Sequence, residues 1–297
     1  MTKASVAIAA ALAGAVFVAS APAFAAQCNH KGGFSGFLAE FRREAAAQGI
    51  SRRGLAALDG LSIDNGVLAA DRRQGVFRQS FAQFSGRMIS RDRLTKGARL
   101  MAQHAGLLDR IEQRYGVPGA VVVAIWGLET DFGVNQGKLS VVRSVATLAY
   151  DCRRSDKFQA ELADALRIID RGDMTAAELK GDWAGEIGQT QFLPSSYVKY
   201  AVNFDGRGHA DLIHSSADAL ASTANYLRNH GWQRGRGWDQ GQPNFTVIQE
   251  WNKAEVYAKT IALFADKLDG GRSVRTADRA PQIETGAKPP QRKHPRH

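Results

Sequence analysis

The sequence predicts a mainly α fold with little β structure. Apolar side chains recur at helical spacing along most of the chain, and each such stripe predicts a helix with one buried face. Strand candidates are few, and residues 245–248 are the best of them. The stripes comprise Phe34, Phe37, Leu38, Phe41 and Ala45; Phe77, Phe81 and Phe84; Leu100, His104, Leu107, Leu108, Ile111 and Tyr115; Phe158, Leu162, Ala165, Leu166 and Ile169; Leu220, Ala224 and Leu227; and Tyr257, Ile261, Phe264 and Leu268.

Residues that begin or end helices flank several stripes. Residues 100–115 are expected to form a single helix, which Gly116 ends. Ser155 is expected to cap the following helix at its N-terminus. Thr175 and Glu178 have the spacing of a capping box, which predicts a helix start there.

The first 25 residues have the pattern of a secretory signal peptide. Lys3 is their only charge, an apolar run covers residues 6–18, and the triplet Ala23-Phe24-Ala25 fits the small-x-small rule for cleavage. We therefore expect residues 1–25 to be removed and the mature protein to be periplasmic. A retained N-terminal anchor is the alternative. Lipid attachment at Cys28 is not expected, because Gln27 stands where a lipoprotein signal needs a small residue.

The chain is basic, with a formal net charge of +10 that becomes +9 without Lys3. Residues 270–297 contain seven Lys or Arg against two Asp or Glu, a surplus of +5, and almost no large apolar residues. This composition predicts a basic disordered tail. The charge favours an anionic polymer or membrane surface as partner, and a solvated tail without a dedicated role is the alternative. No nucleic-acid motif is present, so nucleic acid is not an expected partner.

The chain has two cysteines, Cys28 and Cys152, and both lie in the exported part. Disulfides persist in that compartment, so we expect one bridge that ties the mature N-terminus to the core. Two unpaired thiols are the alternative.

Glu129 is the best candidate for a catalytic group. It follows an apolar run over residues 121–128 that should be buried. A carboxyl against such surroundings is costly to ionise, so its pKa should rise toward the range that a general acid needs near neutral pH. The alternative is a carboxyl at a helix end that is only capped or paired.

Residues 180–200, KGDWAGEIGQTQFLPSSYVKY, form a second candidate region. Glycines alternate there with carboxyl, amide, hydroxyl and aromatic side chains, among them Asp182, Glu186 and Gln191. Such groups bind sugar hydroxyls and stack on pyranose rings. A tight turn between helices, with Pro194 starting the next helix, explains the composition equally well.

Residues 203–211 have spacing similar to a calcium-binding loop, with oxygen-bearing side chains at alternate positions and Gly208 at the sixth. Arg207 places a positive charge where a ligand oxygen is expected, and no Glu closes the loop. We therefore favour a metal-free loop, with calcium as the alternative. The candidate ligands would be Asn203, Asp205, His209 and Asp218.

Four motifs, WGLETDFG, SVATLAYDCRRSDKF, LKGDWAGEIGQTQFLPSSYVKYAVNFDGRG and ASTANYLRNHGW, resemble the membrane-bound lytic transglycosylase B family of murein-degrading enzymes. The resemblance covers about residues 34–268. It implies a lysozyme-like catalytic core at 117–269 after an N-terminal helical region at 26–116. It also implies cleavage of peptidoglycan strands between N-acetylmuramic acid and N-acetylglucosamine, leaving 1,6-anhydromuramic ends, by a monomer that requires no cofactor.

The resemblance assigns roles to individual residues. Glu129 matches the catalytic glutamate, and the substrate-binding positions would be Asp182, Gln191, Tyr226, Trp251, Asn252 and Tyr257. This chain departs from the family pattern in having Asp182 in place of Ser, Glu186 in place of Ala, Trp251 in place of Tyr and Arg207 in place of Asp.

Two rival functions remain open at this point. A hydrolytic muramidase would use Asp182 or Glu186 as its second carboxylate. A non-catalytic peptidoglycan-binding scaffold would keep the cleft without turnover, although such a protein has no need of a buried carboxyl at Glu129.

Overall fold

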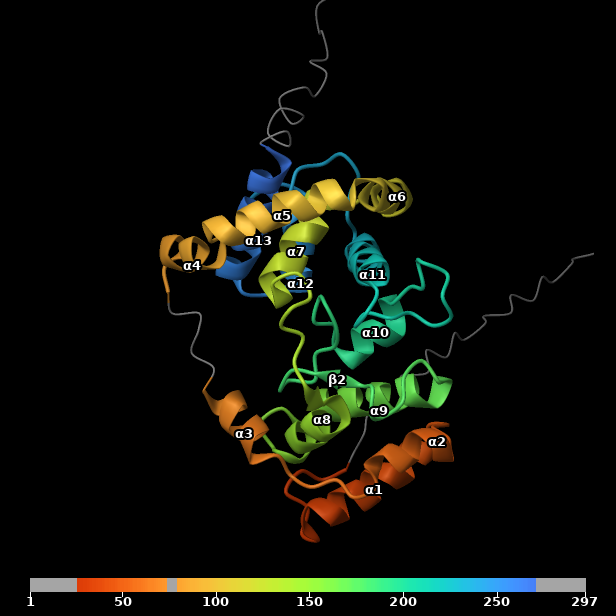
Figure 1. Cartoon of the computed structure of the whole chain (residues 1–297). Coiled ribbons are helices and arrows are strands. Elements are labelled where there is room, and N and C mark those ends of the chain that lie inside the picture. The colour runs from red at the N-terminus through yellow and green to blue at the C-terminus, as the bar shows by residue number, and fades with distance from the viewer. Residues whose placement is uncertain (1–25, 74–78, 271–297) are drawn as a thin grey trace, which may run out of the picture.

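The computed structural model describes residues 26–73 and 79–270, which are mainly helical (Figure 1). The predicted signal peptide, most of the predicted tail and Phe77 lie outside the described residues. The helices are α1 (Gly33–Ala47), α2 (Arg52–Leu55), the 3-10 helix η1 (Ala56–Leu58), α3 (Asn65–Arg72), α4 (Phe81–Met88), α5 (Arg91–Gln103), α6 (Ala105–Tyr115), α7 (Gly119–Thr130), α8 (Val141–Tyr150), α9 (Ser155–Arg171), α10 (Pro194–Tyr200), α11 (Ser216–Asn229), α12 (Phe245–Trp251) and α13 (Glu255–Asp269).

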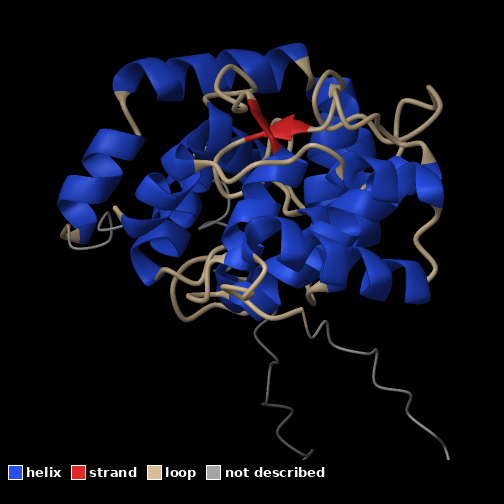
Figure 2. Ribbon diagram, turned by 90° about the horizontal axis from the view of Figure 1, so that it is seen from below, coloured by secondary structure: helices blue, strands red, loops and turns tan. Residues whose placement is uncertain are grey.

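The predicted scarcity of β structure is confirmed in this part of the chain. Strands β1 (Leu139–Ser140) and β2 (Lys180–Gly181) form a two-stranded antiparallel sheet, in which Leu139 pairs with Gly181. Figure 2 shows this short sheet among the helices. It joins the segment that follows α7 to the segment that follows α9.

Buried apolar side chains form two clusters. One, here called the α8–α9 core, also includes side chains of α1, α2, α3 and α10. The other, the α7–α13 core, includes side chains of α4, α6, α11 and α12. They occupy the lower and upper parts of Figure 1. Tyr226 and Trp251 pack against both cores, so these residues mark the boundary between the two.

Helix α7 is apolar on all sides. Every residue from Gly119 to Thr130 is buried except Glu129, which is partly exposed. Such a helix must be surrounded by protein, and α7 packs against α5, α6, α11 and α13. Gly127 lets the chain fold back after the helix, because a Cβ there would lie 2.7 Å from the Phe132 ring. Glu129 therefore sits in the last turn of a tightly packed helix.

Two helix predictions need correction. Residues 100–115 are not one helix: α5 ends at Gln103 and α6 begins at Ala105, with His104 between them. Figure 1 shows that the two helices run in different directions. The apolar spacing continues through the break, so spacing alone does not reveal it. Residues 245–248 are the start of α12, not a strand. A short apolar run fits either element, and here Phe245, Val247 and Ile248 are buried in the α7–α13 core.

Two predicted caps also differ in the structure. Ser155 is the first residue of α9, and its hydroxyl donates to the Ala149 carbonyl at 2.5 Å instead of capping the helix. Thr175 and Glu178 exchange the hydrogen bonds of a capping box, at 2.8 and 3.2 Å, but they enclose a turn. The chain there leads directly into β2, which leaves no room for a helix.

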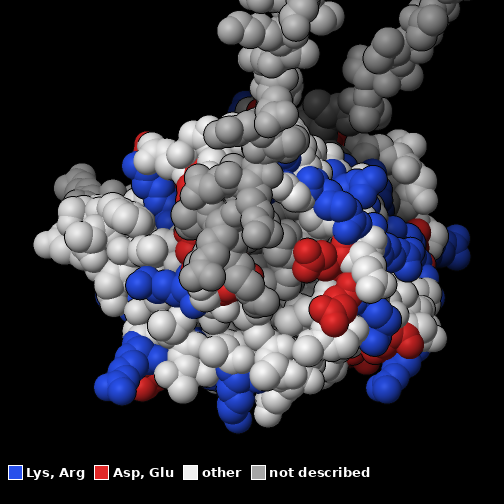
Figure 3. Space-filling model, turned by 90° about the horizontal axis from the view of Figure 1, so that it is seen from above, with Lys and Arg blue, Asp and Glu red and all other residues white. Residues whose placement is uncertain are grey.

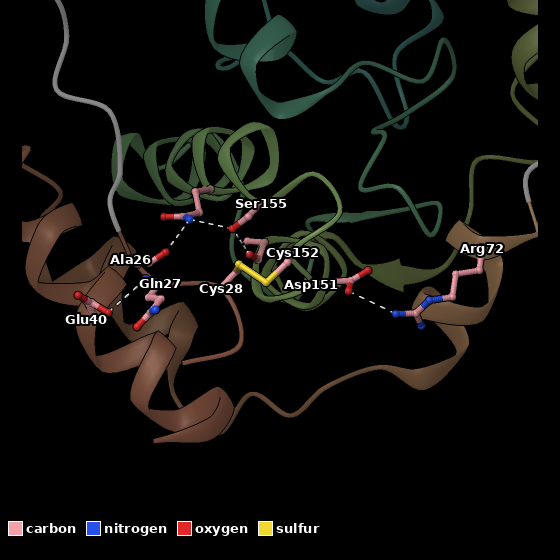
Figure 4. The surroundings of a disulfide bond; sticks show 10 residues. Ala26, Gln27, Cys28, Glu40, Arg72, Asp151, Cys152 and Ser155 are labelled. Atoms are coloured by element: carbon pink, nitrogen blue, oxygen red, sulfur yellow. Dashed lines mark hydrogen bonds and ion pairs between the residues drawn. A yellow bond between two sulfur atoms is a disulfide. The ribbon is translucent and has the colours of Figure 1, made fainter. Parts of the chain in front are cut away.

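The predicted disulfide between Cys28 and Cys152 is present, with an S–S distance of 2.12 Å (Figure 4). It ties the segment before α1 to the link between α8 and α9. Gln159 supports the same contact, since its Nε2 donates to the Ala26 carbonyl at 2.8 Å. On the other side, Arg72 of α3 pairs with Asp151 at 3.3 Å. The N-terminal helices are thus fastened to the α8–α9 core by covalent and polar contacts.

Surface charge is mixed in the described residues. On the face in Figure 3, Lys and Arg side chains are spread around the periphery, and Asp and Glu side chains lie among them. Many carboxylates are paired; Asp71, for example, is buried beneath Arg153 and Arg154. No helix within residues 26–73 and 79–270 is both long and apolar enough to cross a membrane.

Candidate active site

Glu129 receives hydrogen bonds from two aromatic side chains that follow it by more than 100 positions. The indole Nε1 of Trp251, the last residue of α12, donates to Glu129 Oε1 at 2.8 Å. The hydroxyl of Tyr257 in α13 donates to the same carboxyl. Tyr257 is itself buried, and its ring packs against Phe84 of α4 at 6.1 Å. The carboxyl of Glu129 is therefore held in one place by groups from both neighbouring helices.

The surroundings change the acidity of this carboxyl. Burial raises the pKa of Glu129 to about 7, against the opposing effect of the Trp251 and Tyr257 hydrogen bonds, and the negative charge of Asp182 acts in the same direction as burial. A carboxyl with this pKa is present in both protonation states near neutral pH. The prediction of a raised pKa for Glu129 is thus confirmed.

The next carboxyl along the chain behaves differently. Asp131 is paired with Lys96 at 3.0 Å and with Arg93 at 3.3 Å, both from α5. Although burial opposes the effect, hydrogen bonds from these cations hold the pKa of Asp131 below its usual value. Glu129 and Asp131 are therefore distinguished by their partners, despite being two residues apart.

A tight turn over residues 181–192 lies beside Glu129 and carries Asp182 and Glu186. Bridges pair Gly181 with Ile187 and Ile187 with Phe192. The helix end and this turn are joined directly, because the Thr130 hydroxyl donates to the Gln189 carbonyl at 2.5 Å. The two elements that carry the acidic residues are thereby fixed relative to one another. We call residues 181–192 the acidic turn.

Aromatic rings form one wall of the site. Trp251 meets Phe192 edge-on at 5.5 Å and Tyr226 at 5.1 Å. The Tyr226 hydroxyl donates to the Glu250 carbonyl at 2.8 Å, so this side chain cannot swing freely. His230 stacks on Tyr226 at 4.0 Å. Burial raises the pKa of Tyr226 to about 12, which keeps it neutral.

Two amide side chains complete the predicted set. Gln191 has a positive backbone φ of 54°. Residues other than glycine rarely adopt this conformation, and it is often found at functional sites. The Nε2 of Gln191 donates to the Gly188 carbonyl at 2.9 Å, which supports this conformation. Asn252 follows α12 directly, and its Oδ1 accepts the Ala254 N–H at 3.0 Å. Both amides have further hydrogen-bonding groups that can face a ligand.

These residues surround a cavity of about 170 Å³, whose lining comprises Glu129, Glu186, Gln191, Phe192, Leu193, Ser196, Tyr226, Glu250, Trp251 and Asn252. Five of the catalytic and substrate-binding residues expected from the sequence are in this lining: Glu129, Gln191, Tyr226, Trp251 and Asn252. Asp182 and Tyr257 are not in the lining but both act on the Glu129 carboxyl. A larger cavity of about 660 Å³ lies at the opposite end of α7, next to Gly119 and Trp238. We place the site at the smaller cavity, because it alone of the two contains the perturbed carboxyls.

Two contributors were not expected from the sequence. Glu250 lines the cavity, and His230 supports Tyr226. His230 lies four positions after Tyr226 at the end of α11, so helical spacing could have identified that pair. Ser196 belongs to the candidate region at residues 180–200 and also lines the cavity, whereas nothing in the local sequence around Glu250 indicates that it does so.

The candidate calcium ligands of the loop at residues 203–218 make hydrogen bonds and ion pairs with other protein groups. Both carboxylate oxygens of the buried Asp218 accept backbone N–H groups, from Phe204 at 2.7 Å, Asp205 at 3.1 Å and Asp211 at 2.9 Å.

The other candidate ligands are also engaged. Asn203 and Asp205 both accept the Arg207 N–H at 3.0 Å, and His209 pairs with Asp173 outside the loop at 3.0 Å. Within the described ranges, no group of three or more His, Cys, Asp or Glu side chains is placed to hold a metal ion.

Comparison with known proteins gives consistent matches. Residues 33–241 match the family model described as Transglycosylase SLT domain. The chain is 37% identical over 157 residues to membrane-bound lytic murein transglycosylase B of Escherichia coli K12. That alignment covers 52% of this chain and 43% of the relative, so the chain spans less than half of that relative's length.

Solved structures show the same architecture. SltB3 of Pseudomonas aeruginosa, in complex with NAG-anhNAM-pentapeptide, has a TM-score of 0.75 and 33% identity over 80% of each chain. The Escherichia coli lytic transglycosylase Slt35, in complex with calcium, has a TM-score of 0.69 and 26% identity, over 79% of this chain and 93% of that one.

Proposed function

Because the chain belongs to the transglycosylase SLT family, we propose that it is a lytic transglycosylase that cleaves the bond between N-acetylmuramic acid and N-acetylglucosamine in peptidoglycan. The observation that carries this proposal is the setting of Glu129. Its carboxyl lies in a cleft wall, holds two donors from α12 and α13, and has a pKa raised by burial to about 7. Such a group can give up a proton and take it back at the same pH.

The reaction has two proton transfers through Glu129. In the first, the protonated carboxyl gives its proton to the glycosidic oxygen as the bond from C1 of the muramic residue to that oxygen breaks. The N-acetyl group of the same residue stabilises the positive charge at C1. In the second, the Glu129 carboxylate removes the proton of the C6 hydroxyl, whose oxygen bonds to C1. No water is consumed, and the product carries a 1,6-anhydromuramic end.

The surrounding residues would bind and orient the glycan strand. Tyr226 and Trp251 offer ring faces and edges at the cavity, and Gln191 and Asn252 offer amides to hydroxyl and N-acetyl groups. The solved complexes of SltB3 with NAG-NAM-pentapeptide and NAG-anhNAM-pentapeptide support a ligand of this class. The indole N–H of Trp251 supplies a donor to Glu129, which compensates for the hydroxyl expected from the family pattern.

A hydrolytic muramidase is less well supported. It would need Asp182 or Glu186 as a second catalytic carboxylate that activates water or attacks C1. Asp182 Oδ1 accepts the N–H groups of Ala184 at 2.8 Å and Glu186 at 3.0 Å, and Glu186 is hydrogen-bonded to Asp182. Neither carboxyl is free in the way that a nucleophile or base should be.

We further propose that the protein acts as a periplasmic monomer after removal of residues 1–25, and that residues 270–297 contact an anionic surface. No cofactor is required by the reaction. The engaged oxygens of Asp218 lead us to expect that activity does not depend on calcium.

The test is mass spectrometry of purified peptidoglycan after digestion by the mature protein. We expect muropeptides lighter by one water than hydrolytic products, and no product from Glu129→Gln. Glu255→Gln is a matched control, because Glu255 is an exposed carboxyl on α13 that pairs with Lys259. Reducing ends would instead establish a hydrolase, and binding without any product would establish a scaffold.

A further inference from the structure

The acidic turn places two carboxyls on one rigid support beside Glu129. Gly181 permits its tight form, since a Cβ there would lie 2.1 Å from the Glu186 carbonyl oxygen. The Asp182 N–H donates to that same oxygen at 3.1 Å. Gly185 has a φ of 82°, which side-chain-bearing residues rarely adopt. The positions of Asp182 and Glu186 are therefore fixed by the backbone.

The contacts of the two carboxyls differ. Burial raises the pKa of Asp182, but its Oδ1 accepts backbone N–H groups of Ala184 at 2.8 Å and Glu186 at 3.0 Å, and these donors act against the rise because they favour the ionised form. Glu186 has no such backbone donors among the described contacts and is hydrogen-bonded to Asp182. Burial raises the pKa of Glu186 well above its usual value, and the charges of Asp182 and Glu129 add to that effect. Of the two carboxyls, Asp182 is therefore the one whose contacts favour a negative charge, and Glu186 is the one whose surroundings favour the proton.

We propose that Asp182 and Glu186 are positioning residues that hold a single fixed negative charge beside Glu129 and so prepare it for both proton transfers. Before bond cleavage, the charge favours the protonated Glu129 that the first transfer needs. After cleavage, it makes the Glu129 carboxylate a stronger base for the C6 hydroxyl. Glu186 keeps Asp182 in place and does not contribute a second charge. This inference rests on the proposed function.

Other charged groups near Glu129 are accounted for by their own partners. On α5, Arg93 and Lys96 pair with Asp131. On α12, Glu250 pairs with Lys253 at 2.5 Å. Burial raises the pKa of Glu186, and the positive charge of Lys157 on α9 opposes that rise without cancelling it. Trp251 and Tyr257 are neutral donors to Glu129. Asp182 is thus the charge that acts on Glu129 without being neutralised by a cation.

The test compares Asp182→Asn and Glu186→Gln with the wild type over a range of pH. Asparagine keeps an oxygen for the two backbone N–H groups but removes the charge. We expect the alkaline limb of kcat/KM for glycan cleavage to move down by about one pH unit in Asp182→Asn. A glutamine at position 186 can still donate a hydrogen bond to Asp182, whose charge is retained. The alkaline limb of kcat/KM in Glu186→Gln should therefore stay at the wild-type pH. Asp182→Ser is a second variant that removes the charge with a different side chain.

A direct titration separates this inference from the proposed function. The Glu129 carboxyl can be followed by infrared difference spectroscopy of the resting protein, with Glu129→Gln to assign its band, and no turnover is needed. We expect the pKa of Glu129 to fall in Asp182→Asn and Asp182→Ser and to stay in Glu186→Gln. An unchanged pKa in all three variants would overturn the proposal, and so would an equal fall in all three. A normal titration without anhydro products would overturn the proposed function alone.

Discussion

Trp251 is the residue that both binds the Glu129 carboxyl and lines the cavity beside it. Its indole N–H donates to Glu129 at 2.8 Å, and its ring meets Phe192 and Tyr226 edge-on. Hydrogen bonds to an ionised carboxyl stabilise that form, so Trp251 lowers the pKa of Glu129 while burial raises it. The Trp251 side chain therefore limits the rise in the pKa of Glu129 and also forms part of the cavity wall.

Trp251→Phe should raise the pKa of Glu129 above about 7, because it removes a donor to the carboxylate and keeps the ring. The alkaline limb of kcat/KM should then move up, opposite to the change expected in Asp182→Asn. The measurement is the same pH profile of glycan cleavage. Trp251→Tyr serves as control, since a phenol can restore a donor. A limb that does not move in Trp251→Phe would mean that this hydrogen bond does not act on the acid.

At the scale of elements, the site depends on how the segment after α7 meets the acidic turn. Gly137 comes very close to this turn: a Cβ at Gly137 would lie 2.2 Å from the Gly181 carbonyl oxygen and 2.5 Å from the Asp182 N–H nitrogen. Backbone atoms cannot give way as a flexible side chain can. The spacing between the two segments is therefore set by the absence of a side chain at residue 137.

Gly137→Ala should reduce kcat/KM at least about ten-fold, because the added methyl group must displace the turn that holds Asp182. The loss should exceed what a fall in stability explains, so thermal unfolding is measured alongside activity. Gly241→Ala is the matched control. It has a similar φ, 88° against 84°, but nothing lies within 4 Å of its added Cβ. Equal effects of the two substitutions would show that backbone strain alone is responsible.

At the scale of the whole molecule, the site lies where the α8–α9 core meets the α7–α13 core. Glu129 comes from one core, the acidic turn contributes Ile187 and Phe192 to the other, and Tyr226 and Trp251 touch both. A carboxyl kept at this junction costs the protein stability. The free energy of unfolding should fall as pH rises from the normal Glu pKa of 4.5 to the folded value of about 7, because only the folded protein holds the proton there.

Glu129→Gln should therefore be more stable than the wild type at pH 8, by up to about 3 kcal/mol. The advantage should disappear near pH 4.5, where the carboxyl is protonated in both folded and unfolded chains. Urea unfolding of both proteins at pH 5 and pH 8 measures the difference. Glu255→Gln, at an exposed position, should show no such gain on raising the pH. A pH-independent difference for Glu129→Gln would contradict a raised pKa at this site.

Much of the helical architecture could be predicted from local pattern. The stripes at residues 34–45, 158–169 and 257–268 lie in α1, α9 and α13, because a helix with one buried face must repeat its apolar residues at that spacing. The wrong predictions came from runs that fit more than one element. Residues 245–248, a short apolar run, form the start of a helix instead of a strand. The apolar spacing at residues 100–115 continues without interruption through His104, where the helix breaks.

By itself the sequence determined that Glu129 follows a fully apolar segment, that Cys28 and Cys152 could pair, and that the motifs match a known family. Only the tertiary structure decided which groups reach Glu129. Trp251 and Tyr257 meet it across 122 and 128 positions of chain, and Asp182 meets it from the acidic turn. Local spacing describes which face of a segment is buried, whereas the acidity of a carboxyl depends on donors and charges that packing brings from distant segments.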